Sequence, residues 1–293
     1  MVGITSGHKY TGNKATPDDF SIRFLVGRKV EHHKCKRRLP RFLYGRTAKG
    51  KVDRSLRFAT DVVALGKVRA SCGAGSFLQC TPGGRGTASL IFRDKSVPSA
   101  GFFLVSCAHV LSRFSGGQKV IASSECCSDS LFASLVFASK PNQDRLPFDV
   151  GLAKLSPQCV PQPDGTVVGD LGLPAVQLSG IAPPELVAPK HSVSCRMRVS
   201  HNTRGVIADH PTGGEIDIEY DEAGMTLTVE NVCLLEVDKC VLPGDSGGLI
   251  FTQDGQALGI VIASSDAGWA IFHPFGSAFQ YLADNTNRTY KPF

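Results

Sequence analysis

The chain has 293 residues, of which 42% are hydrophobic and 20% are charged, a composition typical of a globular protein with one large domain or two small cores. This composition excludes wholesale disorder, and no uncharged apolar run reaches the ~18 residues that a transmembrane segment needs. The first nine residues lack the apolar core of a secretory signal, so we expect an intracellular protein whose ten cysteines are mostly reduced thiols.

The net charge of +6 is distributed unevenly along the chain. Residues 1–69 contain 17 Lys and Arg against 5 Asp and Glu, whereas residues 70–293 contain 15 against 21. Residues 1–69 therefore form a basic N-terminal extension, which includes a short strand-like run at residues 20–26. We favour a solvated arm, or a strap that lies on the acidic remainder of the chain.

Other roles for the basic extension stay open. Phe42, Tyr44 and Phe58 interleave with its Lys and Arg residues, as in a surface that stacks nucleic-acid bases. A contact with nucleic acid, with an anionic membrane surface or with a protein partner is therefore an alternative, and so is a segment removed by cleavage.

Short β-type runs separated by Gly and Pro begin near residue 70. Strand-sized apolar runs lie at residues 87–92, 101–105, 131–137 and 150–155. Such runs at close spacing, with no long helical periodicity between them, indicate an all-β sandwich or barrel. We place a first β unit at residues 70–160.

A proline-rich stretch separates this unit from a second one. Seven prolines lie between residues 157 and 189, and because proline removes a donor from a β ladder, residues 161–189 are interpreted as a connection. Residues 190–293 are the second β unit and its C-terminal tail. Its signals are an alternating run at 215–220, two apolar runs at 249–251 and 258–262 around a hairpin-type turn, and a short closing helix at 276–283.

The sharpest motif is Pro-Gly-Asp-Ser-Gly-Gly at residues 243–248. A serine hydroxyl becomes a good nucleophile only when a base takes its proton, and its attack on a carbonyl creates an oxyanion that needs donors already aimed at it. Glycines around Ser246 allow a tight turn that directs N–H groups at that oxygen. The alternative is a glycine-rich hairpin turn without chemistry, although five fixed residues arise by chance in only about one such chain in a thousand.

Two further residues have the chemistry that Ser246 needs. An apolar run leads into His109, whose imidazole can act as a base and then as an acid near neutral pH. Asp149 precedes the run at 150–155, so its carboxylate is expected to be partly buried and to need a partner such as a histidine N–H. Each has a structural alternative, because a lone histidine is usually structural and a lone Asp usually serves a turn. Asp144 is a rival for Asp149, but its polar neighbours favour an exposed loop.

His109, Asp149 and Ser246 follow one another at separations of 40 and 97 residues. In this order and spacing the chain resembles the chymotrypsin/trypsin-like serine peptidases over about residues 70–282. The resemblance implies two six-stranded antiparallel β-barrels, with His109 and Asp149 on the first and Ser246 on the second. It implies that Ser246 is the nucleophile, that His109 is the general base and acid, and that Asp149 orients His109. The N–H groups of Gly244 and Ser246 would form the oxyanion hole, the substrate would be a protein or peptide, and we expect no metal or cofactor.

Several positions depart from the pattern of the family. Val110 and Leu242 stand where digestive members carry cysteines, so two of their usual disulfides are impossible. No Ile-Val-Gly-Gly sequence precedes His109, which argues against activation through a new N-terminus that pairs with Asp245. Ile262 stands where family members commonly have a serine that bonds the triad carboxylate.

The resemblance also points to a substrate pocket. Cys240, six residues before Ser246, stands at the position of the pocket base and favours an uncharged or apolar substrate side chain over Arg or Lys. Ile262, Ala263 and Ser264 would pair with the substrate backbone and line the pocket. His273 is a further candidate for the lining, although a structural role is the stronger interpretation.

The sequence leaves two alternatives to an active peptidase. A protease-like domain, inactive or latent, would act mainly by binding, with its basic extension on a partner or nucleic acid; the complete set of three residues argues against it. Zinc binding is a weaker alternative, because His32, His33, Cys35, Cys72 and Cys80 lack a regular ligand spacing.

Overall fold

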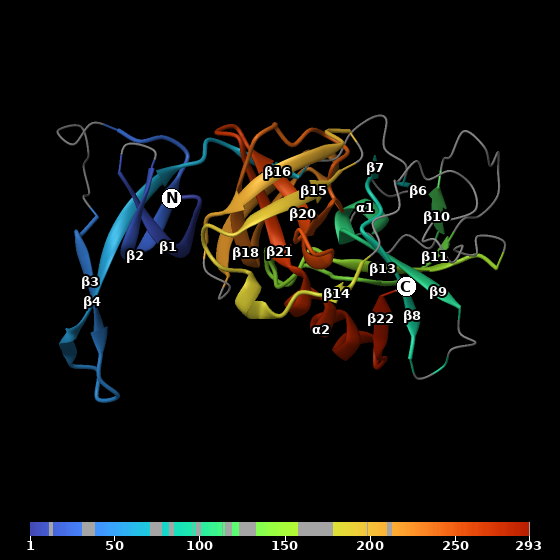
Figure 1. Cartoon of the computed structure of the whole chain (residues 1–293), viewed down its shortest axis with the longest axis horizontal. Helices are drawn as coiled ribbons and strands as arrows, with labels where there is room; N and C mark the ends of the chain where they lie inside the picture. The colour runs from blue at the N-terminus through green and yellow to red at the C-terminus, as the bar shows by residue number, and fades with distance from the viewer. Residues whose placement is uncertain are drawn as a thin grey trace.

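The computed structural model describes residues 1–11, 14–30, 39–70, 78–81, 85–95, 97, 101–112, 114, 119–122, 133–157, 178–197, 199–209 and 213–292. These residues form two extended β-sheets with little helix. Figure 1 shows two barrels side by side, with the blue N-terminal strands beside the second barrel and the green first barrel at the opposite end. The prediction of an all-β, two-barrel fold is confirmed.

The second barrel is a closed ring of six strands. Their order around the ring is β15 (Ser192–Arg196), β16 (Asn202–Ile207), β18 (Met225–Val237), β21 (Trp269–Pro274), β20 (Gln256–Ser265) and β19 (Leu249–Phe251), which pairs again with β15. Every neighbouring pair is antiparallel. Buried and exposed residues alternate strictly along β16, as a strand with one face on a core requires.

The first barrel closes through one bent stretch of chain. Its strands are β6 (Leu78–Thr81), β7 (Arg85–Gly86), β8 (Leu90–Asp94), β9 (Phe102–Ser106), β10 (Lys119–Ala122), β11 (Ala133–Ala138) and β13 (Gly151–Leu155). β7 pairs with β6 and β8 pairs with β9, so the stretch from 85 to 94 joins the two ends of the ring. The run predicted at 87–92 begins as a strand only at Leu90, because Thr87 donates its N–H to the carbonyl of Ser246 in the second barrel (2.6 Å).

The N-terminal strands extend the sheet of the second barrel. They are β1 (Gly3–Thr11), β2 (Lys14–Val26), β3 (Phe42–Arg46), β4 (Val52–Ala64) and β5 (Val68–Ala70). β1 pairs with β17 (Gly214–Tyr220), which forms a hairpin with β18, while β2 joins β1 to β4. A buried ion pair between Arg23 of β2 and Asp209, which follows β16, links the N-terminal strands to the second barrel (2.6 Å). The described part of the extension is therefore ordered as strands: β1 and β5 pair with strands of the second barrel's sheet, while β3 and β4 continue that sheet away from the barrel (Figure 1).

The remaining elements are short. They are β12 (Arg145–Leu146), β14 (Gly180–Ile181), β22 (Tyr290–Pro292), the helices α1 (Ala108–Ser112) and α2 (Phe275–Thr286), and the 3₁₀ turns η3 (Pro184–Leu186) and η4 (Asp221–Ala223). The predicted closing helix is confirmed as α2, which ends at Asn287 in the left-handed conformation. Among the described residues, no helix combines the length and the apolar character that crossing a membrane requires. Most of the proline-rich connection, residues 161–177, lies outside the described part.

Candidate active site

His109 and Asp149 meet at one end of the first barrel. His109 is the second residue of α1, which begins where the buried strand β9 ends, and Asp149 lies just before β13. β9 and β13 are antiparallel neighbours, with Ser106 opposite Gly151. The pairing therefore brings together two residues that are 40 positions apart. Asp149 accepts the backbone N–H of His109 at Oδ1 (3.1 Å) and contacts Nδ1 of the same imidazole at Oδ2.

The second barrel holds Asp149 from the other side. The hydroxyl of Tyr220 donates to Oδ2 (3.0 Å), and the backbone N–H of Asp149 donates to Nε2 of His273 (2.8 Å). Asp149 is completely buried. Burial acts to raise the pKa of its carboxyl, but the charge and hydrogen bonds of His109 together act more strongly, and the pKa lies below its ordinary value. Asp149 is thus ionised at neutral pH and fixed in orientation. The rival Asp144 lies in an exposed turn.

His273 lies behind Asp149 and is completely buried. Its Nδ1 is 3.0 Å from the carbonyl of Asn231, while Nε2 accepts the N–H of Asp149. Burial lowers the pKa of His273 to about 4, so the ring is neutral at pH 7 with its proton on Nδ1. Both nitrogens are engaged inside the protein, which is the arrangement of a structural residue.

Ser246 lies in a turn that depends on glycine. Gly244 and Gly247 have φ angles of +108° and +91°, where a side chain is strained. A Cβ on Gly247 would also overlap the carbonyl oxygen of Thr87. Thr87, which sequence reasoning did not single out, fixes this turn from the first barrel. Its N–H donates to the carbonyl of Ser246 (2.6 Å) and its hydroxyl to the carbonyl of Gly244 (2.8 Å).

The carboxylate of Asp245 is held without any cation among the described residues. It accepts the N–H groups of Val199 (2.7 Å), Ser200 (3.1 Å) and Leu242 (2.8 Å), together with the hydroxyl of Ser200. These donors satisfy a fully buried carboxylate. Among the described residues, these donors take the place of the new N-terminus that pairs with this Asp in digestive members of the family, and Asp245 serves the turn.

The hydroxyl of Ser246 donates to the carbonyl of Ile262 (3.0 Å), and the residue is completely buried. Within the described part of the chain, the N–H groups of Gly244 and Ser246 donate to no backbone acceptor. Gly86 lies between α1 and the serine turn, because a Cβ on Gly86 would overlap both the side chain of Val110, which follows His109, and the carbonyl of Ser246. The place where the two barrels meet, called the junction below, thus holds a candidate nucleophile (Ser246), two N–H donors (Gly244 and Ser246) and the His109–Asp149 pair.

The predicted pocket residues occupy different environments. Ile262 and Ala263 are completely buried in β20, Ser264 is half-buried, and Cys240 is exposed.

Cys107, Cys195 and Cys233 are buried free thiols. Among the described residues, the potential metal ligands close enough to share an ion are those of Cys107, His109 and Asp149. These atoms are already used, because His109 binds Asp149 and the thiol of Cys107 donates to the carbonyl of Val261 (3.3 Å). Of the weaker zinc candidate, His32, His33, Cys35 and Cys72 lie outside the described residues.

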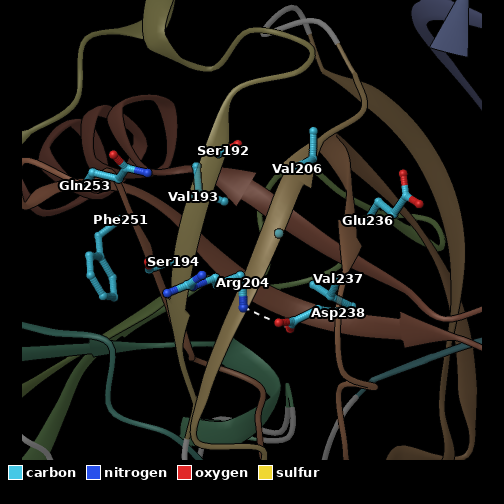
Figure 2. A pocket seen from close by; sticks show the side chains of 11 residues that line it. Ser192, Val193, Ser194, Arg204, Val206, Glu236, Val237, Asp238, Phe251 and Gln253 are labelled. Atoms are coloured by element: carbon cyan, nitrogen blue, oxygen red, sulfur yellow. Dashed lines mark hydrogen bonds between the residues drawn. The ribbon is translucent and has the colours of Figure 1, made fainter.

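A separate groove of about 670 Å³ lies on the second barrel. Figure 2 shows it along β15 and β16, where the N–H of Arg204 donates to Asp238 (3.0 Å). None of the residues that line it belongs to the His109–Asp149–Ser246 junction. We therefore centre the candidate active site on the junction.

Comparison with known proteins supports this geometry at the level of the fold. No protein-family model matches the chain, and no curated protein matches its sequence. Among solved structures, a glutamic acid specific serine protease that uses a histidine triad in substrate binding matches at 17% identity with a TM-score of 0.50, over 75% of this chain and 98% of its own. The chain has the chymotrypsin-like fold. Thermobifida fusca protease A and Cellulomonas bogoriensis chymotrypsin match at 18% and 16% identity with TM-scores of 0.43 and 0.41, covering 72% and 75% of this chain and 90% and 96% of theirs.

Within this chymotrypsin-like fold, sequence reasoning missed Thr87 and Tyr220. Tyr220 ends the alternating run of β17, and nothing in that run indicates a partner 71 positions away. One signal was present in the sequence: Ile262 stands where a serine was expected, so a different donor had to satisfy Asp149. In this chain that donor is the hydroxyl of Tyr220.

Proposed function

We propose that the chain is a serine endopeptidase that hydrolyses peptide bonds through an acyl-enzyme. The observation that carries the proposal is the Asp149 carboxylate, which binds both the backbone N–H and Nδ1 of His109 beside a glycine-shaped turn with Ser246 at its centre. Such an arrangement fixes the imidazole with Nε2 facing away from Asp149, the tautomer that a general base requires.

In the proposed reaction the hydroxyl of Ser246 first turns away from the carbonyl of Ile262, which it contacts in this structure. Its Oγ then attacks the substrate carbonyl while Nε2 of His109 takes its proton. The N–H groups of Gly244 and Ser246 bind the oxyanion, an effect that typically contributes about 10²–10³ in rate per donor. His109 then gives the proton to the leaving amine as the peptide C–N bond breaks. Water attacks the resulting ester with His109 again as base, which releases the acid and restores the serine.

The substrate class rests on the pocket positions. Cys240 carries no fixed charge at the proposed pocket base, and Ile262 and Ala263 are apolar, so we propose an uncharged or apolar side chain at the cleaved residue. We do not extend the glutamate specificity of the matching protease to this chain, since His273 is buried behind Asp149 with both nitrogens engaged. Neither the described residues nor the comparisons support a contact with nucleic acid. The free thiols of Cys107, Cys195, Cys233 and Cys240 agree with a proposed intracellular location.

A serine-directed fluorophosphonate tests the proposal. We expect labelling of the full chain and complete loss of labelling in Ser246→Ala. Ser277→Ala, at an exposed position of α2 away from the site, is the matched control and should still be labelled at Ser246. An unlabelled wild-type chain that binds peptides would instead favour a protease-like binding domain.

A further inference from the structure

The strand β20 is longer than its neighbour β19, and β5 occupies the rest of the same edge. β19 pairs with β20 no further than Ile260. From Ala263 to Ser265, β21 lies on one side of β20 and β5 on the other, with Ala70 opposite Ala263 and Arg69 opposite Ser264. The segment Ile262–Ser264 is the one proposed to pair with the substrate backbone. A part of the chain itself therefore lies on that edge.

β5 runs in the direction that leads to the proposed nucleophile. It is antiparallel to β20, so its chain proceeds from Val68, opposite Ser265, towards Ile262. The carbonyl of Ile262 holds the hydroxyl of Ser246. An extended peptide that continued this register would bring its backbone alongside Ser246.

The other side of β5 is also lined by a strand that leads to the site. β17 pairs with β5 in parallel, with Glu219 opposite Arg69. The next residue of β17, Tyr220, donates to Asp149, and its ring centroid lies 5.2 Å from that of His109. β20 and β17 thus enclose a slot one strand wide, and both walls end at the His109–Asp149–Ser246 junction.

We propose that β5 is an intramolecular inhibitor strand that fills this slot, and that an extended peptide substrate binds by replacing it. This inference rests on the proposed peptidase function and adds its regulation. Backbone pairing on both sides provides affinity for a peptide strand of varied sequence. The completely buried Ser246 and the nearly buried His109 (4% exposed) agree with a closed site that must open before a substrate enters.

Charge complementarity holds the inhibitor strand in place. Arg69 bonds Asp266 (2.9 Å) and also faces Glu219 (3.8 Å) and Asp221 (4.0 Å), while the N–H of Lys67 donates to Asp266 (3.2 Å). These side chains are well exposed, so each ion pair contributes little alone. Val68 of the same strand is buried in the hydrophobic core, so the ion pairs are one part of what holds β5 in the slot, and reversing one charge should shift the balance towards displacement.

The test uses the full chain and the rate of fluorophosphonate labelling. Arg69→Glu places a fourth carboxylate among three and should raise the labelling rate about fivefold, because the open fraction sets the apparent reactivity. Arg69→Glu with Asp266→Arg restores one ion pair and should return the rate towards that of the wild type. Arg54→Glu, the same charge change at an exposed position of β4, should leave the rate unchanged.

A peptide with the sequence of residues 63–70 provides a second measurement. It should inhibit Arg69→Glu competitively, while a scrambled peptide should not. Hydrogen exchange at residues 263–265 reports the slot without chemistry: we expect faster exchange in Arg69→Glu, protection again with the peptide, and unchanged exchange in β15 and β16 as the folding reference. Equal labelling and equal exchange in the wild type and Arg69→Glu would overturn the inhibitor role alone. Absence of labelling in every form, with exchange changed as expected, would overturn the proposed peptidase function.

Discussion

Two buried aspartates, Asp149 and Asp209, join distant parts of this chain with partners of opposite character. Asp149 links the two barrels and faces His109, whose imidazole can gain or lose a proton near neutral pH. Asp209 links the N-terminal strands to the second barrel and forms an almost completely buried ion pair with Arg23. The same buried group is thus part of the proposed catalytic site in one place and a structural anchor in the other.

The largest expected effect comes from a substitution at Asp149 that changes its contact with His109 and leaves Asp209 untouched. Asp149→Asn keeps the shape of the side chain but favours the wrong tautomer of His109, so kcat for a cleaved peptide should fall by about 10⁴. Hydrogen exchange in β1 should not change, because the contacts of Asp209 are intact. A variant that keeps more than a tenth of wild-type kcat would contradict the role given to Asp149.

The second-largest expected effect concerns the buried ion pair between Arg23 and Asp209. Arg23→Ala leaves Asp209 buried with only the hydroxyl of Thr5 (3.1 Å) and the N–H of Leu234 (2.7 Å), so the free energy of unfolding should fall by about 3–5 kcal/mol. Urea unfolding measures this change. The exposed Arg28→Ala is the control and should stay within about 0.5 kcal/mol of the wild type. Labelling of Ser246 should persist in both variants, and its loss in Arg23→Ala would show that the two sites are not separable.

The smallest effect is a dependence of stability on pH that comes from His273. Its pKa is about 4 in the folded protein, against 6.5 for an ordinary histidine. Between these values the unfolded chain binds a proton that the folded chain does not, so the free energy of unfolding should decrease as the pH falls from 6.5 to 4, by on the order of 3 kcal/mol. His273→Gln should flatten this decrease, measured as unfolding by urea at several pH values. An equally steep decrease in the variant would assign the effect to other groups.

The strands and the candidate triad could be predicted from the sequence because they rest on local patterns. Alternation marks β17, apolar runs mark β9 and β13, and the glycines around Ser246 mark a tight turn. Which distant strands pair with one another could not be predicted in this way. The register of β5 on β20 joins positions that are 193 to 197 apart, and the three residues of β5 carry no signal of the partner strand. His273, 124 positions from Asp149, was a pocket candidate for the same reason.

The donors around Asp245 bear on how the serine turn reaches its working shape. All four come from Val199, Ser200 and Leu242, within the second barrel's own part of the chain. The turn therefore does not depend on an amino group released by cleavage elsewhere in the chain. It can form as soon as the second barrel folds. Under the proposed function, the timing of activity would therefore depend on whether β5 occupies the substrate slot, and not on the assembly of the serine turn.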